Sequence, residues 1–153
     1  MPIIFGATID GVRSARLVKA GKKTVTLRML NDETRVCLDH RHPDQITHVS
    51  KADGPIKWQV GASYAVLPGR GKHAICRVVI ESMTLTVAAV YNQAQLFEEG
   101  FGVAARRVAF GGSHLYDRWD RFKMTLEALY PDVKDIVHKP AISIKFHLDR
   151  KGK

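Results

Sequence analysis

The chain has 153 residues, of which 45% are hydrophobic and 25% charged, and its formal net charge is +9. This size and composition predict a single domain, residues 1–153, with a hydrophobic core. No apolar run approaches the roughly 20 residues of a membrane span, and the first residues lack the basic and long apolar regions of a signal peptide. We therefore expect a soluble, cytoplasmic protein.

The first predicted element is a short helix over residues 9–17, because apolar side chains recur there at helical spacing and Gly21 follows as a helix-ending glycine. A basic turn then leads into a strand that begins at Thr24. Val25 and Leu27 face one side of this strand, and the intervening polar residues face the other. The polar side is expected to line a pocket.

The middle of the chain divides into a polar stretch and a hairpin. Residues 31–55 contain several Pro and Gly breakers and show weak strand character only at 35–38, so we expect a long surface excursion there. Two β-rich runs, 63–67 and 73–83, flank a short turn with the sequence Pro-Gly-Arg-Gly-Lys. This composition predicts a β-hairpin with a basic tip.

Two helices and a last strand are predicted in the second half. Thr86 is a suitable N-cap for a helix over 87–99 that Gly100 ends, which places Glu99 at a helix end. Ser113 is expected to begin a helix over 115–129, whose apolar residues recur at spacings of three and four. Residues 142–148 then alternate as a half-buried strand. This irregular order of elements predicts an α+β fold with a mixed or antiparallel sheet.

Three segments together suggest a family. The stretch Gly21-Lys22-Lys23-Thr24-Val25-Thr26-Leu27-Arg28 gathers two ammonium groups, two hydroxyls and a guanidinium within eight residues. With the later Glu99-Gly100-Phe101 and the closing apolar strand 141–148, the chain resembles the ASCH family of PUA-like domains. The resemblance implies a small bent β-barrel with a mixed sheet and surrounding helices.

The resemblance also implies a catalytic site. Lys23, Thr26 and Glu99 correspond to the lysine, threonine and glutamate of small ASCH amidohydrolases that remove acetyl from acetylcytidine. Thr26 would be the nucleophile and Glu99 would orient the amide or protonate the leaving amine. Lys23 would be the base, which requires its pKa to fall from about 10.4 by roughly three units. It would also have to lie in the turn, because Lys23 and Thr26 face opposite sides of a regular strand.

The charge of the chain, with a pI near 9.8, predicts an anionic partner such as RNA or a modified nucleoside. A generally basic surface that only maintains solubility would explain the same charge, since net charge does not show clustering. In the RNA interpretation, aromatic side chains stack on unpaired bases and basic side chains contact phosphates. The candidates are Trp58 and Tyr64 for stacking, and Lys22, Arg28, Arg70, Lys72, Arg106 and Arg107 for phosphates.

Several functions stay open at this point. The basic segment 102–113 is longer than in the compact amidohydrolases, which suggests a substrate larger than a free nucleoside. A metal-independent ribonuclease would need a general acid and base, for which Lys23, Tyr64, His73 or Glu99 are candidates. The sequence is also compatible with a non-catalytic RNA-binding module and with a partner-binding accessory protein.

No metal site or cofactor is predicted. Cys37 and Cys76 are far apart in the sequence and form neither a zinc motif nor a disulfide framework. The spacing of His40, His42 and His48 matches no standard zinc pattern. The Gly-Arg-Gly-Lys tip of the predicted hairpin lacks the full phosphate-loop motif, which argues against an NTPase.

Overall fold

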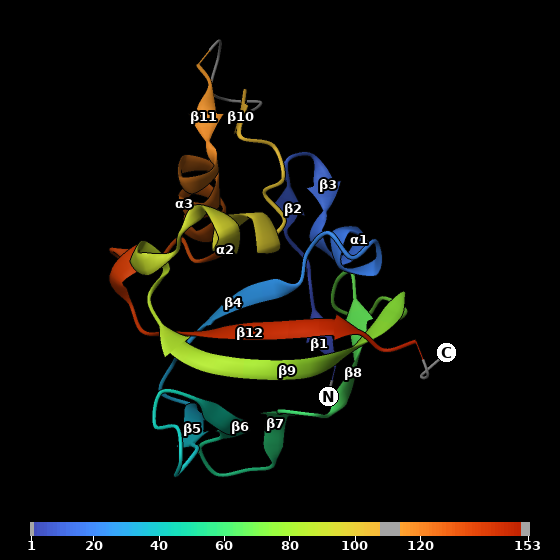
Figure 1. Ribbon diagram of the computed structural model, residues 1–153, viewed down its shortest axis with the longest axis vertical. Helices are drawn as coiled ribbons and strands as arrows, with labels where there is room; N and C mark the ends of the chain where they lie inside the picture. Colours follow the sequence, from blue (N-terminus) through green and yellow to red (C-terminus); the bar gives the residue numbers. More distant parts are fainter. Residues whose placement is uncertain (1, 108–113, 151–153) are drawn as a thin grey trace.

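The computed structural model describes residues 2–107 and 114–150, and a five-stranded mixed sheet curled into a half-barrel forms its centre (Figure 1). The first strand pairs in parallel with its neighbour, and the other pairs are antiparallel. In sheet order the strands are β1 (Ile3–Ile4), β8 (Ser63–Leu67), β9 (Cys76–Thr86), β12 (Ala141–Leu148) and β4 (Val25–Met29). The hairpin predicted over 63–83 and the strand predicted over 142–148 are therefore confirmed.

A second sheet of three strands lies below the first in Figure 1 and consists of β5 (Thr34–Leu38), β6 (Ile46–Lys51) and β7 (Ile56–Gln59). The expectation of a surface excursion over 31–55 was wrong. Ile46 and Val49 are fully buried in the core that the two sheets share. Their burial contributes apolar contact area that the largely polar composition of residues 31–55 did not indicate.

Helices cover the upper side of the large sheet: η1 (Ala88–Val90), α2 (Gln93–Glu98), α3 (Arg118–Leu129) and η2 (Ile136–His138). The helix predicted over 87–99 was wrong in its start, because Thr86 is the last residue of β9. Asn92 caps α2 instead, and its side chain and that of Gln95 form a reciprocal capping box. Glu99 is the residue that ends α2, as predicted.

The helix predicted over 9–17 also begins later. Residues 8–13 form a small hairpin of β2 (Thr8–Ile9) and β3 (Val12–Arg13), and α1 (Ser14–Lys19) follows it. The turn is Asp10-Gly11, a dipeptide typical of tight hairpins. A second small hairpin pairs β10 (Ala105–Arg106) with β11 (Tyr116–Asp117). Asp117 caps α3, and Ser113, the predicted start, lies outside the described residues.

Strand β12, which lies between β9 and β4, separates two hydrophobic cores. Ile142, Ile144 and Phe146 pack in the core that contains the three-stranded sheet and α1. Ala141 faces the other core, which α2 and α3 cover. Among the described residues, no helix is long and apolar enough to cross a membrane.

Candidate functional site

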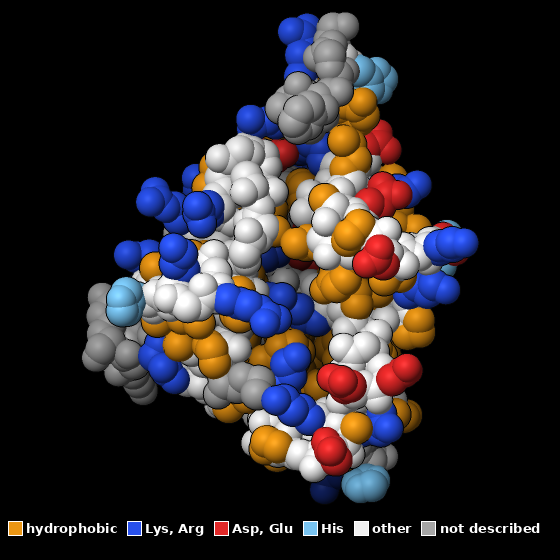
Figure 2. Space-filling model, turned by 180° about the vertical axis from the view of Figure 1, so that it is seen from behind, with side chains coloured by type: hydrophobic (Ala, Val, Ile, Leu, Met, Phe, Trp, Pro, Cys, Tyr) orange, Lys and Arg blue, Asp and Glu red, His pale blue; other side chains and the backbone are white. Residues whose placement is uncertain are grey.

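A cavity of about 180 Å³ lies beside β4, the edge strand of the large sheet. Residues 4–7, which follow β1, form one wall, and α3 contributes Phe122, Thr125 and Leu126 from another side. The face opposite to that of Figure 1 is hollowed between two lobes, and Lys and Arg side chains gather along the hollow (Figure 2). Lys23, Thr26 and Glu99, the three predicted catalytic residues, all line the cavity, together with Arg28.

Lys23 lies in the turn between α1 and β4, as the catalytic hypothesis requires. Its backbone N–H donates to Leu17 O, and β4 begins only at Val25. The side chain is almost fully buried. Its ammonium group donates to Val25 O at 3.0 Å, to Glu99 O at 2.7 Å and to Glu99 Oε1 at 2.8 Å. These bonds use all three N–H donors of the ammonium group.

Glu99 is held through both of its carboxylate oxygens. Oε1 pairs with Lys23, and Oε2 accepts a hydrogen bond of 3.1 Å from the hydroxyl of Tyr91. The Tyr91 hydroxyl also lies 2.9 Å from Ser143 Oγ on β12. Burial, reinforced by the charge of Glu99, raises the pKa of Tyr91, which therefore stays a neutral hydrogen-bond donor.

Burial lowers the pKa of Lys23, and this effect exceeds the opposing attraction of Glu99. The positive charge of Arg28 lowers the pKa further. This is the direction that a general base requires. The three hydrogen bonds nevertheless hold the charged group away from other partners, so Lys23 must lose its proton and release an acceptor before it can act as a base.

Thr26 and Arg28 supply polar groups with hydrogen-bonding capacity to spare. The Thr26 side chain is largely buried, and its hydroxyl has no hydrogen bond to any residue in the described part of the chain. The Arg28 Nη2 atom donates to Ile4 O at 2.7 Å, and the guanidinium lies 5.1 Å from the centre of the Phe5 ring. The Arg28 Nε atom is buried and lacks a partner among residues 2–107 and 114–150.

The predicted stacking residues do not reach this cavity. Trp58 on β7 and Tyr64 on β8 are buried in the core between the two sheets. The Tyr64 hydroxyl accepts a hydrogen bond of 2.7 Å from the backbone N–H of Gln59. Their assignment as stacking platforms is therefore corrected: both side chains are buried, and the ammonium group of Lys57 lies 4.4 Å from the centre of the Trp58 ring. Tyr64 is equally removed from any ribonuclease role beside Lys23.

The basic residues outside the cavity lie in three places. Lys22 is exposed in the turn beside Lys23, whereas Arg70 and Lys72 are exposed in the turn between β8 and β9. Arg106 and Arg107 line a second hollow next to α3. The structure thus places Arg28 in the cavity and Arg106 and Arg107 in the hollow beside it. Arg70 and Lys72 form a separate basic site in the β8–β9 turn.

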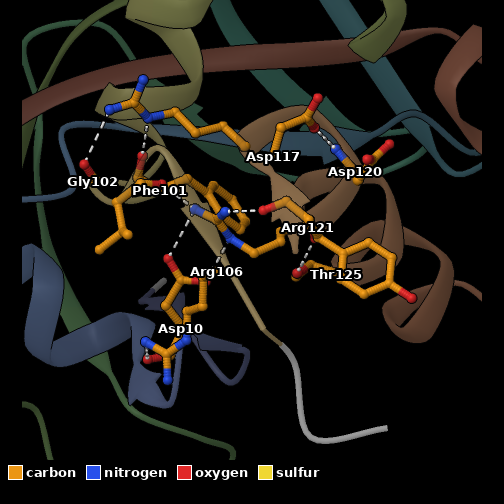
Figure 3. A network of polar contacts seen from close by, with 11 residues as sticks. Asp10, Phe101, Gly102, Arg106, Asp117, Asp120, Arg121 and Thr125 are labelled. Carbon is orange, nitrogen blue, oxygen red and sulfur yellow. Dashed lines mark hydrogen bonds and ion pairs between the residues drawn. The ribbon is translucent and has the colours of Figure 1, made fainter. Parts of the chain in front are cut away.

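Sequence reasoning missed a buried ion pair that positions α3 over the cavity (Figure 3). Arg121 on α3 is almost fully buried and donates to both carboxylate oxygens of Asp10, at 2.9 and 3.3 Å. It also donates to Tyr116 O at 2.6 Å and to Val103 O. An arginine directly before Phe122, a residue of the apolar stripe of the predicted helix, was the signal that could have revealed this contact. The bonds join the β2–β3 hairpin, the segment after Glu99 and the start of α3.

The described residues contain no group of three His, Cys, Asp or Glu side chains that could hold a metal ion. Cys37 is exposed and Cys76 is half-buried, and both are free thiols. The cavity beside β4 is therefore a candidate site because of its polar side chains, and the described part of the chain offers no metal-ligand set.

Comparisons with known proteins show a shared fold. No family model and no curated protein matches the chain. The crystal structure of protein EF3133 from Enterococcus faecalis V583, described by the family model DUF984, is similar with a TM-score of 0.58 and 14% identity, over 97% of this chain and 80% of that one. The ASCH domain from Lactobacillus crispatus JV V101 has a TM-score of 0.47 and 14% identity, over 88% and 69% of the two chains.

The predicted α+β architecture is thus confirmed as a fold, a mixed sheet curled into a half-barrel with a few helices. At 14% identity the likeness extends to the fold alone. Any activity has to be argued from the cavity itself.

Proposed function

We propose that the cavity beside β4 binds one nucleoside unit, either of an RNA strand or of a free modified nucleoside. The observation that carries this proposal is the set of polar groups that share the cavity. They are the Thr26 hydroxyl, which has no hydrogen bond within the described part of the chain, the Arg28 guanidinium, whose Nε atom also lacks a partner there, and the Lys23–Glu99 pair. A chain with a net charge of +9 also favours an anionic polymer as the source of that nucleoside.

The size and lining of the cavity fit this kind of ligand. Its volume of about 180 Å³ is below the roughly 300–1,000 Å³ of sites for drug-sized ligands, so it suits one ring system better than a whole oligonucleotide. Phe5 and Leu126 provide apolar walls for the faces of a base. A hydroxyl that both donates and accepts, with a guanidinium that only donates, matches the mixed edge of a nucleobase.

Binding can be tested by calorimetry with cytidine and acetylcytidine and by competition with labelled single-stranded RNA. Gly6 is exposed, lines the cavity and has open space where a side chain would begin. Gly6→Leu should narrow the cavity and weaken nucleoside binding at least about tenfold, whereas Gly6→Ala should change it little. Equal binding by both variants, or no binding of nucleoside and RNA by the wild type, would refute the proposal.

A second candidate is hydrolysis of an N-acetyl group, because Lys23, Thr26 and Glu99 line the same cavity. In this reaction the Thr26 hydroxyl attacks the acetyl carbon and gives its proton to neutral Lys23. The amine leaves with a proton, and water then releases acetate from the acyl-threonine. The lowered pKa of Lys23 supports the base role. Glu99 would orient the amide or relay the proton from Lys23 to the leaving amine, which returns Lys23 to its neutral form.

The hydrolase is tested by acetate release from acetylcytidine in EDTA, with cleavage of labelled RNA measured in parallel. Thr26→Val keeps the shape of the side chain and removes the hydroxyl, so it should abolish acetate release while nucleoside binding persists. Thr84→Val on β9, outside the cavity, is the matched control. RNA cleavage that Thr26→Val leaves intact would favour the ribonuclease instead, and absence of both activities would leave a binding module.

A further inference from the structure

A second hollow of about 530 Å³ adjoins the cavity along α3. The two share four lining residues, so a ligand in the cavity would have the second hollow as its immediate neighbour. The shared residues are Ala7, Phe101, Thr125 and Leu129. The outer wall of the second hollow is formed by the β2–β3 turn and by Arg106 and Arg107.

The charges around the second hollow are mostly positive. The residues that line it carry three guanidinium groups and one carboxylate. The guanidinium groups belong to Arg106, Arg107 and Arg121, and the carboxylate belongs to Asp10. Arg121 holds this carboxylate through two hydrogen bonds, so Asp10 does not compete for the other arginines. The Nη1 atom of Arg106 donates a hydrogen bond of 2.7 Å to the backbone oxygen of Asp10 (Figure 3). Arg107 makes no hydrogen bond in the described part of the chain.

The cavity itself provides less charge for an anion. Glu99 neutralises Lys23 at 2.8 Å, and Arg28 is already bonded to Ile4 O. A phosphate would therefore be attracted to the exposed guanidinium groups of Arg106 and Arg107 in the second hollow. Arginine can bind phosphate oxygens with two parallel N–H donors.

We propose that the second hollow is a phosphate subsite, in which Arg106 and Arg107 hold the phosphate of the nucleoside that occupies the cavity. The inference rests on the proposed function and narrows it: the ligand is a phosphorylated nucleoside, as a mononucleotide or as one unit of a strand, and not a free nucleoside. Arg121 stays bonded to Asp10 and positions the wall without touching the ligand.

The test compares cytidine and acetylcytidine with their 5′- and 3′-monophosphates and with a single-stranded trinucleotide. Arg107→Gln removes one guanidinium that has no structural bond among the described residues. Arg35→Gln is the matched control, because Arg35 is exposed on β5, at the opposite end of the molecule from β10 (Figure 1).

We expect a monophosphate or the trinucleotide to bind at least about tenfold more tightly than the nucleoside, as for one charge-assisted contact. Arg107→Gln should remove most of this advantage and leave nucleoside binding unchanged. For the trinucleotide, the slope of log affinity against log salt should fall by about 0.7. Arg35→Gln should change none of these values. If Arg107→Gln weakens binding of the trinucleotide alone, the phosphate belongs to a strand. If it weakens binding of a monophosphate, the phosphate belongs to a mononucleotide.

Three outcomes would overturn the inference, and they are distinguishable. Equal affinity for nucleoside and phosphorylated ligands would refute the phosphate subsite and leave the nucleoside cavity intact. No binding of any ligand would refute the proposed function, and the subsite with it. An equal loss of affinity in Arg107→Gln and Arg35→Gln would show general attraction by net charge, which also overturns the subsite.

Discussion

The substitution Lys23→Met tests the buried ion pair directly. It leaves three oxygen acceptors without their donor, namely Val25 O, Glu99 O and Glu99 Oε1. Both side chains are only 4% exposed, so the three acceptors would lose their donor in a largely buried site. Removing one partner of such a pair lowers the free energy of unfolding by about 3–5 kcal/mol. For a chain of this size, the melting temperature should fall by roughly 6–20 °C.

Urea unfolding followed by tryptophan fluorescence measures this loss. Lys22→Met is the matched control, because the same substitution at the exposed neighbouring residue should change the free energy of unfolding by less than about 0.5 kcal/mol. The double variant Lys23→Met/Glu99→Leu should regain most of the loss, since it leaves no unpaired charge. Equal stability of the two single variants, within about 1 kcal/mol, would refute the buried pair.

Two further predictions concern the same region. Burial lowers the pKa of Lys23 below 10.5 in the folded protein. Between this lowered pKa and 10.5, the unfolded chain therefore binds more protons than the folded chain. The contribution of Lys23 to the free energy of unfolding is then lost as the pH falls through that window. The difference in unfolding free energy between wild type and Lys23→Met should therefore grow as the pH rises toward 10.5, and a shrinking difference would contradict the direction of the shift. Gly100 has φ +112°, and an added Cβ would lie 3.2 Å from Leu17 Cδ1. Gly100→Ala should cost about 1–3 kcal/mol in thermal unfolding, whereas Gly6→Ala should be neutral; equal effects would exclude backbone strain at Gly100.

The elements that the sequence predicted well are those whose pattern is local. The hairpin of β8 and β9 and the strand β12 follow from alternation and turn residues that no distant contact alters. The Asn-x-x-Gln capping box at Asn92 was also readable, but Thr86 offered an earlier cap, and the sheet contacts that extend β9 to Thr86 are not local. The three-stranded sheet was missed because the burial of Ile46 and Val49 depends on strands far away in the sequence.

The candidate site divides in the same way. The resemblance selected Lys23, Thr26 and Glu99, and the structure brings them to one cavity although Glu99 is 76 positions from Lys23. It could not show that Lys23 already donates three hydrogen bonds, because two of the acceptors are backbone carbonyls that only the fold positions. Trp58 was ambiguous for a similar reason: whether an aromatic ring stacks on a ligand or fills a core depends on the surrounding sheet.

The place of β12 in the sheet has a consequence for synthesis of the protein. This strand lies between β9 and β4 and is the only partner of β4 among the described strands, yet it is the last of them to leave the ribosome. A nascent chain that ends before residue 141 therefore carries β4 with unpaired backbone groups and β9 with an open edge, which are sites for misassociation. The wall of the cavity formed by β4 is in place only when residues 141–148 have inserted, so a protein shortened before β12 should lack both the complete five-stranded sheet and the cavity beside β4.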